Sequence, residues 1–342
     1  MDRFILMDGL RGIAALCVFI GHLTQHNGKF IFQSSPLAVD MFFCLSGFVI
    51  AWSYSKKITS GMSFKMFASK RLVRLYPMFL IGLFFGVVAY FVKKISTGTA
   101  ISNSDMFNSL LLNSFYLPFI SKNESLSLSG IFPLNPPSWS LFFELAANLM
   151  FFFFIRYSTK ALLIIAAIIG ALLTWYGLTI YPAPGWRDIH LIGGFLRVGF
   201  SFIVGVLIFR GYQHIPNFNI NPWLMACVLM AMLLMPRSQA WFSFYWISMV
   251  VITIPLMVAI STKIAVDNTF TKTSFEYIGW LSYPLYCVHV PIIDLFKTFG
   301  INDSLVAKAL VFTGAVTVAH LTGKYLDEPI RAAFGNKAKL LA

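Results

Sequence analysis

The chain has 342 residues, of which 58% are hydrophobic and only 11% are charged. Its mean hydropathy of +0.76 excludes a soluble globular domain. The formal net charge is +13, but the basic residues fall in short segments between apolar runs, so they indicate membrane orientation rather than a nucleic-acid partner. Apolar runs of about 20 residues can cross a hydrocarbon core of about 30 Å as helices. We therefore expect an all-α integral membrane protein, built as a polytopic bundle.

The apolar runs predict about ten transmembrane helices within a single membrane-embedded domain that covers residues 1–342. The expected spans are 8–26, 37–55, 75–92, 139–156, 161–181, 191–210, 222–236, 241–260, 275–297 and 305–326. With 106–120 left out of the membrane, most Lys and Arg lie on one side, whereas an eleventh crossing would divide them about equally. We therefore expect both termini to be cytoplasmic and 93–138 to lie outside, where it could fold back as a re-entrant segment.

The first apolar run contains an arginine and a histidine, Arg11 and His22, in "RGIAALCVFIGH". Eleven residues make three helical turns, so the two side chains share one face and stand about 16 Å apart along the axis. Because the run has no small-residue cleavage site, we expect it to remain as the first span and not to be removed as a signal peptide. An anionic group held at Arg11 could then extend a long arm toward His22.

The segment 56–74 between the second and third spans is strongly basic and ends in Arg71 and Arg74. In a helix these two arginines lie three residues apart on one side, where two guanidinium groups form a good fork for phosphate. The alternative is a positive-inside anchor whose side chains extend to lipid headgroups.

Several polar residues lie in or beside the second and fourth spans. Ser46 is most simply a helix-packing residue, and Asp40 could orient an imidazole, bind an acceptor hydroxyl or cap its helix. Glu144 lies one turn beyond Ser140, and a carboxylate inside a span favours a functional role. Trp139 precedes them at the expected outer interface, where an indole ring is common.

The late motif "SYPLYCVHVP" holds Tyr286 and His289, with Pro291 two residues later. A single histidine in a kinked helix is more often a satisfied core group than a catalyst, and we interpret His289 in that way. At the cytoplasmic end of the last span, Arg331 in "DEPIR" could cap helix carbonyls or contact a phosphate. The four cysteines all fall in apolar segments, so we expect no disulfide, metal site or cysteine nucleophile.

Together these stretches resemble one family, the membrane-bound acyltransferase-3 group, which includes bacterial O-antigen and exopolysaccharide O-acetyltransferases. The matching motifs, in the order of the family, are "DGLRGIAALCVFIGH", "VDMFFCLSGF", "RLVRLYP", "WSLFFE", "SYPLYCVHVP" and "DEPIR". The resemblance implies a multi-pass enzyme of the bacterial cytoplasmic membrane. Its activity would be O-acetyl transfer from cytoplasmic acetyl-CoA to a hydroxyl of a cell-surface or lipid-linked glycan such as O-antigen, capsule or exopolysaccharide. The chain resembles the stand-alone type, which has no fused esterase-like domain.

By motif match, the resemblance places the essential histidine at His22, the first-span arginine at Arg11 and the paired arginines at Arg71 and Arg74. We expect the arginines to bind the phosphates of coenzyme A and His22 to act as a general base or as a transient acyl carrier. Glu144, and after it Asp40, would orient His22. The alternative function is a transporter or flippase in which Arg11, His22 and Glu144 form a proton or substrate path.

Overall fold

The computed structural model describes residues 4–25, 30–98, 103–120, 130–300 and 304–340. Within them the chain is helical and has no strand. The helices are α1 (Ile5–Leu23), α2 (Pro36–Thr59), α3 (Phe64–Thr97), α4 (Asn103–Ser114), α5 (Ser138–Phe154), α6 (Thr159–Thr179), η1 (Asp188–His190), α7 (Leu191–Gly211), η2 (Tyr212–His214), α8 (Pro222–Leu234), α9 (Phe242–Ser248), η3 (Met249–Thr253), α10 (Ile254–Ser261), α11 (Thr269–Thr298), α12 (Leu305–Thr322), η4 (Gly323–Asp327) and α13 (Glu328–Leu340).

Each of the ten apolar segments coincides with one of these helices or with a continuous run of them. Seven such segments in the described residues are at least 18 residues long and apolar enough to cross a membrane. The prediction of an all-α, multi-pass membrane protein is thereby confirmed. The number of crossings and the side on which the termini lie stay predictions.

The stretch 106–120 includes the last part of the 12-residue helix α4, which at about 18 Å is shorter than a hydrocarbon core. This agrees with its exclusion from the spans. Residues 99–102 and 121–129, where the expected re-entrant segment would also lie, are outside the described residues.

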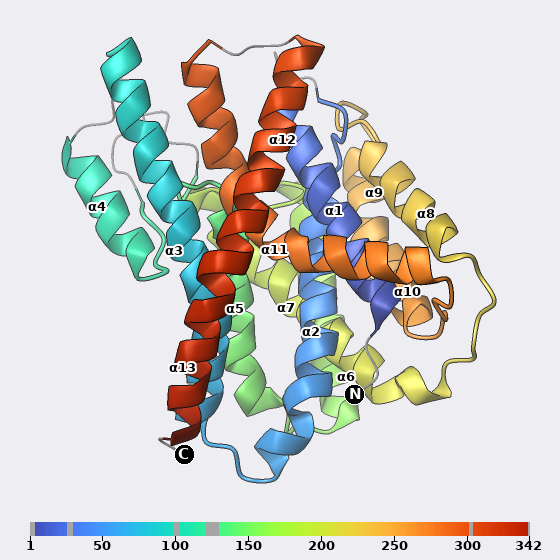
Figure 1. Cartoon of the computed structure of the whole chain (residues 1–342). Helices are drawn as coiled ribbons and strands as arrows, with labels where there is room; N and C mark the ends of the chain where they lie inside the picture. Colours follow the sequence, from blue (N-terminus) through green and yellow to red (C-terminus); the bar gives the residue numbers. More distant parts are fainter. Residues whose placement is uncertain (1–3, 26–29, 99–102, 121–129, 301–303, 341–342) are drawn as a thin grey trace.

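One helix extends beyond the sequence-based expectation, and another bends at the prolines near His289, as the sequence predicted. The last helix does not end near residue 326 but continues through η4 into α13, with a π-helical turn at Gly323–Asp327. Helix α11 begins across the bundle and then turns to run beside α12 (Figure 1). It contains Pro284 and Pro291, each of which removes a backbone N–H and bends a helix.

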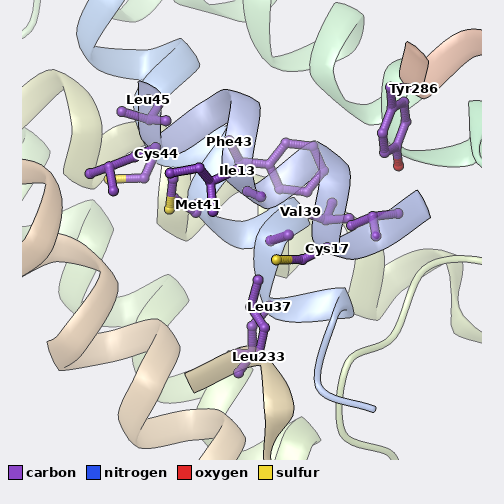
Figure 2. Packing of buried hydrophobic residues seen from close by; sticks show 14 of the residues in the cluster. Ile13, Cys17, Leu37, Val39, Met41, Phe43, Cys44, Leu45, Leu233 and Tyr286 are labelled. Atoms are coloured by element: carbon purple, nitrogen blue, oxygen red, sulfur yellow. The ribbon is translucent and has the colours of Figure 1, made fainter. Parts of the chain in front are cut away.

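Small residues set the closest helix contacts. A Cβ atom on Gly47 of α2 would lie 2.1 Å from the Phe202 carbonyl oxygen of α7, and one on Gly12 of α1 would lie 2.6 Å from the backbone of Ile278 in α11. Both helix pairs therefore pack backbone against backbone, as is common in membranes. Figure 2 shows part of the apolar core, in which Ile13 and Cys17 of α1 lie among buried side chains of α2.

Candidate active site

A cavity of about 210 Å³ lies between α1, α2, α3, α5 and α11. Most of the site residues predicted from the sequence line it. These are Arg11, Ser46, Arg71, Arg74, Ser140, Glu144 and Tyr286. Three arginines and one glutamate give the described lining an excess of positive charge, which favours an anionic ligand.

Arg11 is held in place by the neighbouring helix. Its Nη2 donates to the Gly279 carbonyl at 2.9 Å and to Asp8 Oδ1 at 2.9 Å, and its Nε donates to Ser282 Oγ at 3.1 Å. The glycine contacts between α1 and α11 bring Gly279 and Ser282 within reach, whereas Asp8 lies one turn earlier on the same helix as Arg11. The guanidinium therefore has a fixed position at the cavity wall.

Arg71 and Arg74 lie one turn apart on one side of α3, as the helical spacing predicted, and both line the cavity. The Arg71 guanidinium lies 6.0 Å from the ring centre of Tyr54, and that of Arg74 lies 5.3 Å from the ring centre of Tyr283. The Nε of Arg71 is buried and has no hydrogen-bond partner among the described residues. A buried donor of this kind is costly unless a ligand or water accepts its hydrogen bond.

Glu144 lies in the same cavity, where it accepts a hydrogen bond from Ser46 Oγ at 2.8 Å. This contact gives Ser46 a polar role in the site, beyond helix packing. Glu144 lines the cavity, whereas His22 does not.

Tyr286 connects the cavity to two histidines. Its hydroxyl is 2.8 Å from Ser140 Oγ, and both residues line the cavity. The Tyr286 ring centre is 5.7 Å from that of His289, and the Tyr286 carbonyl is 3.0 Å from His289 Nδ1. His289 in turn lies beside His22, with 2.9 Å between His289 Nε2 and His22 Nδ1.

His22 itself is half-buried and does not line the cavity. The sequence-based expectation is that Glu144 or Asp40 orients His22. In the structure the residue that contacts the His22 ring is His289. Residues 22 and 289 meet because α1 packs along α11. No spacing in the sequence indicates that contact, and the interpretation of His289 as a core group overlooked it.

Asp40 belongs to a different cluster. Both of its carboxylate oxygens accept from Arg197 of α7, at 2.6 and 2.7 Å, and both side chains are fully buried. The Arg197 guanidinium lies between Trp139 and Trp246, at 5.4 and 5.6 Å from their ring centres. This bidentate pair joins α2 to α7 and accounts for Trp139 by cation–π contact. Sequence reasoning did not single out Arg197.

Arg331 also lies away from the cavity lining. Its Nη2 pairs with Asp327 Oδ2 at 2.8 Å, one turn earlier, across the junction of η4 and α13. This ion pair joins η4 to α13, and it differs from the predicted capping of helix carbonyls because Arg331 bonds to a side chain.

Comparisons with known proteins are consistent with this architecture. The model of the Acyl_transf_3 family, described as an acyltransferase domain, matches residues 4–325. The chain is 37% identical over 160 residues to "Protein 2 in picA locus" of Rhizobium radiobacter, covering 44% of this chain and 81% of that protein. It is 32% identical over 160 residues to "Acyltransferase MdmB" of Streptomyces mycarofaciens, covering 44% of this chain but only 38% of that protein.

No solved structure matches the chain. The family match nevertheless covers almost the whole sequence, and five of the six motifs lie inside it, while "DEPIR" follows just after its end. The chain is therefore a multi-pass membrane protein that belongs to the acyltransferase-3 family.

Proposed function

We propose that the protein transfers an acyl group, with acetyl as the favoured one, from cytoplasmic acyl-CoA to a hydroxyl of a cell-surface or lipid-linked glycan. Family membership supports acyl transfer rather than the transport alternative. The observation that favours coenzyme A as the carrier is the arginine-lined cavity, in which Arg71 Nε has no partner among the described residues. Phosphate oxygens are suitable acceptors for such a donor.

The size of the cavity limits what it can hold. Pockets for drug-sized ligands are about 300–1,000 Å³, larger than the 210 Å³ of this cavity. Only the narrow pantetheine arm and its thioester would fit inside, while the nucleotide would remain at the arginine end. The thioester would then extend toward Ser140 and Tyr286, and the Tyr286 ring lies against His289, which contacts His22.

His22 is the proposed reacting group. As a general base it would take the proton of the acceptor hydroxyl as that oxygen bonds to the thioester carbonyl carbon; the carbon–sulfur bond then breaks, and coenzyme A leaves as its thiolate. Alternatively, the imidazole would attack the thioester first, coenzyme A would leave as its thiolate, and the acyl group would pass from the nitrogen to the hydroxyl oxygen while the hydroxyl proton goes to the released imidazole. Both routes need one ring nitrogen of His22 with a free lone pair.

Membrane vesicles that contain the protein test this function. Radiolabelled acetyl-CoA is supplied to the cytoplasmic face, and label in the glycan fraction is measured. We expect transfer with the natural protein and a loss of about 10²-fold or more with His22→Gln, the range of a general base. The control is His214→Gln, which changes an exposed histidine outside the cavity lining. Equal transfer by both variants would contradict the assignment of His22.

A further inference from the structure

The contacts of His289 fix the position of its own proton. His289 is only 1% exposed, and its Nδ1 lies 3.1 Å from the Leu285 carbonyl and 3.0 Å from the Tyr286 carbonyl. Carbonyl oxygens can only accept hydrogen bonds, so Nδ1 must carry a proton. A second proton on Nε2 would make His289 a buried cation, which is costly without a carboxylate partner. The ring is therefore neutral, and its Nε2 has a lone pair.

The same reasoning passes from His289 to His22. His289 Nε2 is an acceptor, and it lies 2.9 Å from His22 Nδ1. His22 Nδ1 must then be the donor, which leaves Nε2 of a neutral His22 without a proton. We propose that His289 is a positioning residue, which holds His22 in the tautomer whose Nε2 lone pair is free for the reaction.

This inference rests on the proposed function, in which His22 reacts with substrate. Either proposed route uses that lone pair, as a base toward the hydroxyl or as a nucleophile toward the thioester. A histidine without such a partner would distribute its proton between the two nitrogens and would often present an N–H where a lone pair is required.

The local structure of α11 supports the position of His289. Pro291 has no backbone N–H, so the carbonyl of Cys287, four residues earlier, has no intrahelical partner. Asn135 Nδ2 donates to that carbonyl at 2.8 Å. Phe19, on the same helix as His22, packs on His289 with 5.9 Å between ring centres. Asn135 therefore fixes the helix backbone two residues before His289, and Phe19 packs against the His289 ring.

Nitrogen NMR tests the tautomer directly. The full-length protein is labelled with ¹⁵N-histidine, placed in lipid bilayers, and the His22 signal is identified by its loss in His22→Gln. We expect Nδ1 of His22 to be protonated and Nε2 to be unprotonated, and we expect this signature to disappear in His289→Leu. A His22 that is protonated at Nε2 in the natural protein would overturn the inference, whatever the enzyme acylates.

Kinetics test the consequence for catalysis, using vesicles and acetyl-CoA. His289→Leu removes the acceptor and should lower kcat about 10- to 100-fold while the KM for acetyl-CoA changes by less than about twofold. His289→Gln can place an amide oxygen near the former Nε2 position and should recover most of the loss. If size-exclusion chromatography shows that both variants are folded and their losses are equal, His289 acts by packing, and its role in positioning His22 is contradicted. Absence of acetyl transfer by the natural protein would instead contradict the proposed function, and the NMR result would still stand.

Discussion

Arg71 and Arg74 present two guanidinium groups to the cavity, each beside a tyrosine ring. A charge-assisted hydrogen bond contributes about 1.5–3 kcal/mol, so we predict that Arg71→Gln weakens acetyl-CoA binding about 10- to 100-fold, and that the double variant with Arg74→Gln weakens it further. Isothermal titration with the protein in detergent or nanodiscs would measure the effect. Lys65→Gln is the matched control, because Lys65 is an exposed cation of the same helix. Unchanged affinity in the Arg71 variant would contradict a phosphate-binding role.

Many residues of the site could be predicted from the sequence, because ionisable groups within the membrane are rare and helical spacing indicates which of them share a face. Arg71 and Arg74 could be paired in this way, and both line the cavity. The partner of His22 could not be predicted, because it lies 267 residues away on a helix bent by two prolines. For the same reason the fully buried pair of Asp40 and Arg197, 157 residues apart, gave no sequence signal.

At the scale of helices, the contact between α1 and α11 brings Gly279 beside Arg11 and His289 beside His22. A close backbone contact lies at Gly12, where an added Cβ would lie 2.6 Å from the Ile278 backbone. Overpacking of this kind costs about 1–3 kcal/mol, so we predict that Gly12→Ala lowers the Tm by several degrees and reduces acyl transfer.

The control for Gly12 is Gly211→Ala at the end of α7. A Cβ at Gly211 would meet no atom within 4 Å, and alanine is a better helix former than glycine. The Tm of this variant should therefore stay the same or rise slightly in a thermal unfolding experiment. If the two variants behave alike, the close contact between α1 and α11 does not hold the site.

The helix boundaries show where sequence periodicity is informative. Long apolar runs located the ten helical segments, because length and apolarity are local properties of the chain. The extension of α12 through η4 into α13 was missed because residues after 326 are polar. A polar amphipathic stretch can continue a helix beyond the membrane, and hydropathy alone does not detect it.

For the whole molecule, the orientation in the membrane determines which substrate reaches which end of the site. The turn between α2 and α3 and the C-terminal end of α13 both lie at the lower end of the bundle (Figure 1). The basic segment 56–74 surrounds that turn, so the positive-inside rule predicts that this end lies in the cytoplasm. The arginine side of the cavity would then receive coenzyme A from the compartment in which it is made.

Cysteine labelling tests this orientation. In a Cys227→Ser background, which removes the exposed natural cysteine, we predict that Thr97→Cys reacts with an impermeant maleimide in intact cells, whereas Ser60→Cys reacts only after the membrane is permeabilised. Both positions are exposed. Thr97 is the last residue of α3, and Ser60 lies four residues before its first. Labelling of Ser60→Cys in intact cells would reverse the topology and exclude donor entry from the cytoplasm through this end.

The central claim is that this membrane protein acylates a surface glycan through His22, and mass spectrometry of surface glycans tests it most directly. Glycans are compared from cells without the gene, with the natural gene, and with His22→Gln at equal protein levels in the membrane. We predict an added mass of one acetyl group per modified sugar with the natural gene alone. Identical glycan masses in all three strains, or full acetylation with His22→Gln, would contradict the claim.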